Sequence, residues 1–107
     1  MTVEKLSGLL GICRRAGRLV TGFDAVVALC STQSALLMIA SDASPRTVKE
    51  LQFRLTAYTV YRLPITKEQT AAVLGSSKPV AVLATADEGF AKAIRTYFTE
   101  EESHYDD

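Results

Sequence analysis

Three arginines gather within a short stretch of the chain, at Arg14, Arg15 and Arg18. They surround Gly17, a residue type that tolerates a left-handed backbone and often ends a helix. Guanidinium groups bind phosphate through paired hydrogen bonds, and the start of a following helix adds backbone donors and a favourable dipole. The cluster therefore indicates a contact with phosphate or nucleic acid. An equally good interpretation is that the arginines only complement the C-terminal end of the preceding helix.

The sequence offers few groups for catalysis or metal binding. It has two cysteines, Cys13 and Cys30, and one histidine, His104, which lies near the C-terminus. The neighbouring arginines could lower the pKa of Cys13 and make it a nucleophile, but no histidine accompanies it in the first 98 residues. Both cysteines fall at inward helical positions, where a thiol behaves as a small apolar group. We therefore expect core packing for both cysteines, and a protein without catalytic residues, metal or cofactor.

Two aspartates, Asp42 and Asp87, follow apolar runs that look like buried strands, a common position for catalytic acids. Each also stands where a helix should begin, and a carboxylate there interacts favourably with the free backbone amides. We favour this second interpretation. The glycines from Gly8 to Gly22 lack the spacing and the preceding strand of a phosphate-binding loop, so no motif supports nucleotide binding.

The net charge of zero conceals an asymmetry along the chain. Residues 1–98 contain all 12 Lys and Arg but only 7 acids, a net charge of +5, and residues 99–107 contain the other five acids. No apolar stretch approaches the roughly 20 residues that cross a bilayer, and the N-terminus lacks a secretory signal. We expect one basic domain over residues 1–98 and an acidic, disordered tail over residues 99–107. The protein should be cytoplasmic, with no membrane partner and some affinity for polyanions.

Apolar periodicity predicts helices that alternate with strands. One helix is expected at residues 2–16, and four more are expected after sequence signals for a helix start. Three of these signals are capping boxes, at Thr21/Asp24, Thr66/Gln69 and Thr85/Glu88. The fourth is Ser44 as an N-cap followed by Pro45. Strands are expected at residues 36–40, 59–63 and 80–84, and the first and third are apolar enough to be buried on both faces. The sequence therefore predicts an α/β fold, a three-layer α/β/α sandwich around a small central sheet.

Three strings in this order resemble one known family. They are RAGRLVTG at residues 15–22, ASDASP at residues 40–45 and TADEGFAK at residues 85–92. Together they are similar to the ribosomal protein L7Ae/L30e family, and most of all to its small stand-alone bacterial branch. The resemblance covers residues 1–98. It implies a mixed central sheet, a non-enzymatic function and binding of kink-turn RNA. The partners that it implies are ribosomal or ribosome-associated RNA and the ribosome itself.

The resemblance also implies where the RNA would bind. In the family, a glycine at the start of the second helix lets RNA approach, and an Asn-Glu-x-x-Lys set follows it. Aligned on Gly22, Asp24 replaces the Asn, while Ala25 and Ala28 replace the acidic and basic side chains. Basic residues beside the third helix and in the 75–78 loop would supply further phosphate contacts. The RNA-binding residues expected on all these grounds are Arg14, Arg15, Gly17, Arg18, Gly22, Asp24, Arg46, Lys49 and Lys78. The alternative is a protein-interaction module that keeps the fold without kink-turn recognition.

Overall fold

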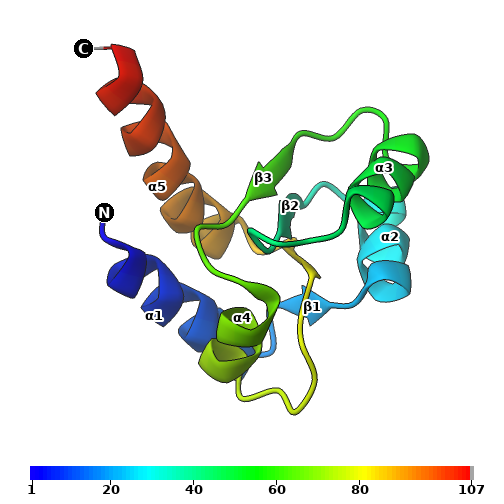
Figure 1. Cartoon of the computed structure of the whole chain (residues 1–107), viewed down its shortest axis with the longest axis horizontal. Helices are drawn as coiled ribbons and strands as arrows, with labels where there is room; N and C mark the ends of the chain where they lie inside the picture. Colours follow the sequence, from blue (N-terminus) through cyan, green and yellow to red (C-terminus); the bar gives the residue numbers. More distant parts are fainter. Residues whose placement is uncertain (107) are drawn as a thin grey trace.

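The computed structural model describes residues 1–106, with side chains through Glu100. Along this part of the chain, five helices alternate with four strands (Figure 1). In chain order they are α1 (Val3–Arg15), β1 (Val20–Thr21), α2 (Phe23–Thr32), β2 (Leu36–Ile39), α3 (Pro45–Arg54), β3 (Val60–Arg62), α4 (Lys67–Leu74), β4 (Val82–Thr85) and α5 (Glu88–Asp106).

The strands form one mixed sheet in the order β1-β4-β2-β3. β2 pairs parallel to β3 and antiparallel to β4, and β4 also pairs antiparallel to β1. The three predicted strands are present, with ends that differ by one or two residues. β1 was not predicted, because two residues are too few to show a periodicity; it is defined by its pairing of Val20 with Ala84 and Thr21 with Leu83.

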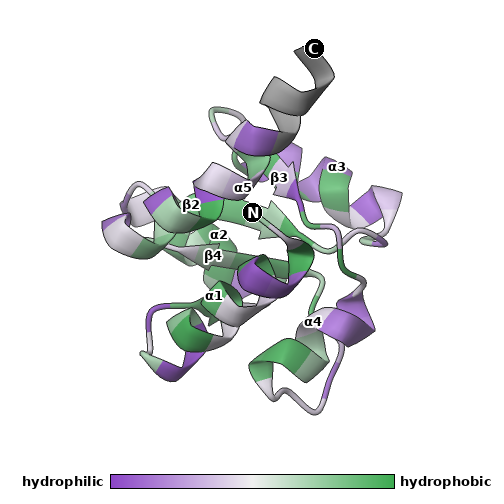
Figure 2. Cartoon of the chain, turned by 90° about the vertical axis from the view of Figure 1, so that its left-hand side faces the viewer, coloured by the Kyte–Doolittle hydropathy of each residue, from purple (hydrophilic) through white to green (hydrophobic). Residues whose placement is uncertain are grey.

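Helices cover both faces of this sheet. Leu36 and Met38 of β2 pack in the cluster that contains α1, α4 and α5, whereas Leu37 and Ile39 pack in the cluster with α2 and α3. Successive strand residues point to opposite faces, so this alternation places β2 between two helical layers. Figure 1 shows the two helical groups on either side of the strands, and Figure 2 shows the apolar strands enclosed by helices with hydrophilic outer surfaces. The predicted three-layer α/β/α sandwich is confirmed.

Two of the predicted helix starts are confirmed in detail. The Ser44 hydroxyl accepts a hydrogen bond from the Thr47 amide at 3.1 Å, and Pro45 is the first residue of α3. Thr66 and Gln69 form the full capping box of α4, in which each side chain accepts from the other's backbone amide. Polar side chains at these positions therefore set where α3 and α4 begin.

The other two predicted caps are wrong. Thr21 lies in β1, and Gly22 is the N-cap of α2, with no side-chain hydrogen bond at that start. Thr85 ends β4, and its hydroxyl donates to the Arg18 carbonyl at 2.7 Å. The reason is the same in both cases. The β-branched Thr lies in a strand, where its pairing in the sheet outweighs its preference for a helix N-cap.

Both aspartates bind backbone amides at helix starts, but only Asp87 caps the helix that directly follows it, as predicted. Asp87 accepts from the Phe90 amide at 2.9 Å and so caps α5. Asp42 accepts from the Lys67 amide at 2.7 Å, and thus stabilises the start of α4 rather than the start of nearby α3.

α5 continues past Phe98, where the sequence analysis placed the end of the domain. The Thr99 hydroxyl donates to the Arg95 carbonyl at 3.1 Å, and the Glu100 carboxylate pairs with the N-terminal amine of Met1. Glu is a good helix former, so the acidic segment can extend the helix. The side chains of residues 101–107, on which most of the expected tail falls, lie outside the described residues. Across residues 1–106, no helix combines the length and apolarity that a membrane span requires.

Candidate nucleic-acid interface

Gly22 connects the sheet to α2 through a backbone conformation that only glycine adopts readily. Its φ is 96° and its ψ is 146°. The Gly22 amide donates to the Val82 carbonyl at 2.9 Å, and its carbonyl accepts from the Val26 amide at 3.0 Å. A side chain at this position would point into open space, since apart from the adjoining residues Thr21 and Phe23 no described residue has an atom within 4 Å of where its Cβ would stand. The backbone at Gly22 is therefore fixed, exposed and approachable.

A surface groove of about 550 Å³ opens beside Gly22. We call it the Gly22 groove. Its wall comes from the start of α2, from Thr47 and Glu50 of α3, and from the segment between α4 and β4, including Lys78. Gly75 ends α4 with a φ of 68°, and the Ser76 hydroxyl then donates to the Lys78 carbonyl at 3.0 Å. The groove thus combines a bare backbone, a helix N-terminus and an exposed lysine.

The predicted residues of α3 lie beside this groove. Arg46 and Lys49 are both exposed. The Arg46 Nε lies 3.2 Å from Oε1 of Glu50, which lines the Gly22 groove. Asp24 is exposed in the first turn of α2, two residues from Gly22. The structure therefore brings Gly22, Asp24, Arg46, Lys49 and Lys78 to one side of the molecule.

The arginine cluster lies elsewhere. Gly17 has a φ of 73° and ends α1 in a Schellman arrangement, in which the Gly17 amide donates to Arg14 and the Arg18 amide donates to Cys13. The Arg18 carbonyl accepts a hydrogen bond from the hydroxyl of Thr85, which lies at the end of β4. The Gly22 amide instead donates to the carbonyl of Val82, which lies at the start of β4. A strand of this length spans roughly 10 Å. The nine predicted residues thus form two groups at opposite ends of β4.

The arginines themselves have mainly local surroundings. Arg14 and Arg15 stand in the last turn of α1, where positive charge complements the helix dipole. The Arg15 guanidinium lies against Gly11 of the same helix. Arg18 Nε lies 3.9 Å from Asp87 Oδ2, with the Arg18 side chain well exposed. All three remain accessible to a polyanion, but none lines the Gly22 groove.

The cysteines belong to the core. Cys13 is fully buried and Cys30 is 6% exposed. Burial raises the pKa of the Cys13 thiol, the nearby Asp87 raises it further, and a hydrogen bond with Thr85 opposes this only in part. Burial likewise raises the pKa of Cys30. A nucleophilic thiol needs the opposite shift, so the prediction of core packing is confirmed. Among the described residues no cluster of His, Cys, Asp and Glu could hold a metal ion.

No protein-family model matches the chain. Curated relatives, however, match it over most of its length. It is 32% identical over 90 residues to the RNA-binding protein YlxQ of Bacillus subtilis (strain 168). The matched region covers 80% of this chain and 87% of that relative. It is also 32% identical over 94 residues to the RNA-binding protein YlxQ of Enterococcus faecium, and this match covers 86% of this chain and 89% of that relative. The chain belongs to the YlxQ family.

A solved structure supports the fold of this YlxQ-family chain. A protein with unknown function from Bacillus halodurans C superposes with a TM-score of 0.74 at 28% sequence identity. The superposition covers 86% of this chain and 94% of that one. The likeness thus extends over nearly all of the α/β/α sandwich that positions the Gly22 groove.

Sequence reasoning missed several residues that line this side of the YlxQ-family chain. Thr47 and Glu50 lie on the outward face of α3, and Phe23 lies at the start of α2. The i, i+3, i+4, i+7 spacing of Phe23, Val26, Val27 and Cys30 predicts one buried stripe on α2, but Phe23 is only partly buried. Phe53 was not singled out, although its sequence position gives a signal. It is out of phase with the buried Leu51 and Leu55, so it must face outward.

Proposed function

We propose that this chain binds structured RNA of the kink-turn class and catalyses no reaction. The observation that carries the proposal is Gly22, a glycine of positive φ at an uncapped helix start that faces an open groove. The names of the YlxQ relatives support RNA as the partner. Ribosomal RNA, or another RNA that assembles with the ribosome, is the target class that the family resemblance favours.

The groove offers three kinds of contact to RNA. The bare backbone at Gly22 allows a sugar-phosphate strand to come close. Because no side chain caps α2, the first amides of this helix are free to donate to a phosphate, and the helix dipole favours the negative charge. Lys78 adds a cation from the opposite wall. These contacts position an RNA strand and do not by themselves read its sequence.

A second candidate function is a protein-interaction module. The observation that favours it is the exposed alanine pair, Ala25 and Ala28, which offers no charged side chain where the family resemblance predicts two. A surface without those groups binds a kinked RNA less selectively. The two functions differ in one measurable property, which is the dependence of binding on the kink.

A gel-shift experiment separates them. We expect the full chain to bind a kink-turn RNA and to bind more weakly when the sheared pairs of the kink are replaced by Watson–Crick pairs. Lys78→Ala should weaken binding, whereas Lys5→Ala, an equal change of charge at an exposed position of α1, should have much less effect. Equal binding of both RNAs by the parent would contradict kink recognition, and no binding at low salt would contradict the whole proposal.

The same assay tests the arginine cluster. With about four phosphate contacts, the logarithm of affinity should fall with the logarithm of salt concentration at a slope of roughly −3 to −4. A triple variant, Arg14→Ala, Arg15→Ala and Arg18→Ala, should flatten this slope if one RNA reaches both ends of β4. An unchanged slope would show that the arginines do not contact RNA and only complement the C-terminal end of α1.

A further inference from the structure

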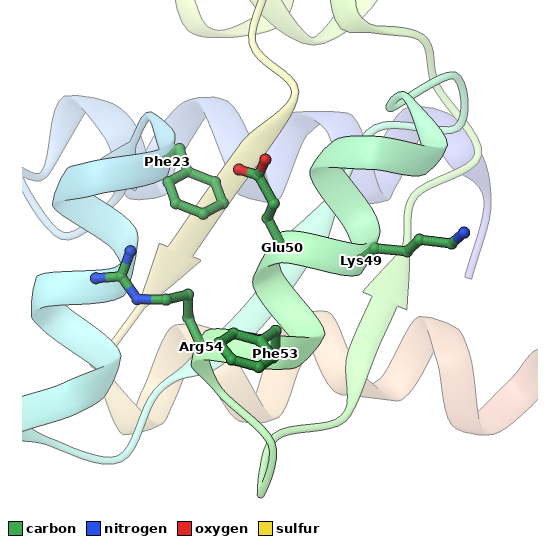
Figure 3. A pocket seen from close by; sticks show the side chains of 5 residues that line it. All are labelled: Phe23, Lys49, Glu50, Phe53 and Arg54. Carbon is green, nitrogen blue, oxygen red and sulfur yellow. The ribbon is translucent and has the colours of Figure 1, made fainter.

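A second groove adjoins the Gly22 groove and holds an exposed aromatic ring. It has a volume of about 460 Å³ and is lined by Phe23, Lys49, Glu50, Phe53 and Arg54. We call it the Phe53 groove. Four of these residues come from α3 and Phe23 comes from α2 (Figure 3). Phe23 and Glu50 line both grooves, so the two grooves lie side by side.

Phe53 is not part of the core. It is 81% exposed, while Leu51 of the same helix is fully buried. The other large apolar side chains exposed within the described residues, Val3 and Ile12, are 40% and 48% exposed and lie on α1. An aromatic ring so open to water contributes little to folding, and its burial by a partner would be favourable. This ring therefore has surface available for a ligand.

The charges around Phe53 indicate the chemistry of that ligand. α3 contains three cations, Arg46, Lys49 and Arg54, and one acid, Glu50, so the helix has a net charge of +2. Glu50 is paired with Arg46, which reduces its repulsion of an anion. Arg54 extends from α3 toward Phe23 and α2, while Lys49 points to the other side of α3 (Figure 3). An aromatic ring flanked by cations suits a nucleotide, whose base stacks and whose phosphates pair with the cations.

We infer that the Phe53 groove binds an unpaired nucleotide of the RNA, with its base stacked on the Phe53 ring and its neighbouring phosphates held by Arg54 and Lys49. The inference rests on the proposed RNA-binding function and extends its site along α3. A strand that occupies the Gly22 groove would pass Phe23 and enter the Phe53 groove directly. Stacking tolerates any base, so this subsite adds affinity for single-stranded RNA rather than sequence selectivity.

The chain has no tryptophan, so a single introduced one reports on this groove alone. The probe is a single-stranded decaadenylate RNA, compared with a ten-residue RNA backbone that lacks bases. We expect the fluorescence of the Phe53→Trp variant to be quenched by decaadenylate and not by the abasic strand. The control is Ile12→Trp, at an exposed apolar position on α1 across the sheet, which should respond to neither strand.

An affinity measurement completes the test. Phe53→Ala should weaken binding of decaadenylate by roughly 5- to 150-fold, as expected for the loss of one stacked base, while Phe53→Tyr should keep most of the affinity. Because Phe53 is exposed, neither change should alter the unfolding curve. If Phe53→Ala binds decaadenylate as the parent does, with no quenching in the Trp variant, the inference is wrong and a protein partner becomes the better occupant. That failure is distinct from failure of the proposed function, in which the parent would bind neither the kink-turn RNA nor decaadenylate.

Discussion

Ala25 and Ala28 are the residues at which this chain departs most clearly from the family pattern. Both are exposed on α2, close to Gly22. Small side chains in a helix often serve packing, but exposed ones have no core contact to lose. Their methyl groups therefore leave open the surface on which a base and a phosphate would be recognised.

Adding the two missing side chains should restore selectivity for the kink. Ala25→Glu together with Ala28→Lys should fold normally, because Glu and Lys are good helix formers and Ala25 stands in the first turn, where negative charge is favourable. A carboxylate that accepts from a guanine edge discriminates by about 1–3 kcal/mol, by analogy with DNA readout. The double variant should thus prefer kinked over unkinked RNA by roughly tenfold more than the parent, measured by gel shift.

The single variants separate the two contributions. Ala28→Lys alone should strengthen the binding of all RNAs, because it adds one phosphate contact without a base contact. Ala25→Glu alone should change the ratio between the two RNAs. A stably folded double variant with an unchanged ratio would mean that RNA does not dock on this face of α2, and would favour the protein-interaction function.

At the scale of elements, the sequence predicted what periodicity and composition determine. Wholly apolar runs located β2 and β4, and polar caps located the starts of α3 and α4. β1 was missed because a strand of two residues exists only through its pairing with β4. In the site too, some features can be predicted from the sequence and others depend on the tertiary fold. Gly22 and Lys78 come together through the tertiary fold, while the arginine cluster, dense in sequence, lies at the other end of β4.

Tyr58, in the segment that precedes β3, forms hydrogen bonds with the C-terminal end of α2. Its hydroxyl lies 2.9 Å from the Cys30 carbonyl and 2.8 Å from the Gln33 carbonyl. Carbonyls at a helix end have no partner within the helix, so this hydroxyl supplies one. Tyr58→Phe should therefore lower the free energy of unfolding by about 0.5–1.5 kcal/mol, measured by urea denaturation at pH 7.

The effect of Tyr58→Phe should depend on pH. Burial raises the pKa of Tyr58 above that of a free tyrosine, and the neighbouring Cys30 adds to this shift. A raised pKa gives stability that is present below the unfolded-state pKa, near 10, and is lost as pH rises through the folded-state value. The difference in unfolding free energy between parent and variant should therefore narrow above pH about 10. A constant difference from pH 7 to 11 would show that the hydroxyl proton is not shared with these carbonyls.

At the scale of the whole molecule, the proposed RNA surface and the acidic segment lie in different layers. The proposed RNA surface lies against the α2 and α3 layer, on which Lys78 faces Thr47 and Glu50. The acidic segment begins at Glu100, whose carboxylate pairs with the Met1 amine beside α1. The sheet separates these two layers, so the first acid of the segment is held away from the groove.

Removal of the acidic segment should therefore affect RNA binding only when electrostatic screening is weak. At physiological ionic strength the screening length is about 8 Å, and at 0.01 M it is about 30 Å, comparable with the 35 × 30 × 26 Å extent of the protein. A chain that ends at Phe98 should bind kink-turn RNA with nearly the parent's affinity at physiological salt and several-fold more tightly at 0.01 M. Loss of the Met1–Glu100 pair, a surface interaction worth at most about 1 kcal/mol, should leave folding nearly unchanged. The control for chain length keeps the segment and neutralises it, with Glu100→Gln, Glu101→Gln, Glu102→Gln, Asp106→Asn and Asp107→Asn, and it should match the truncated chain. A large gain in affinity at physiological salt would instead mean that the acids reach the groove and compete with RNA directly.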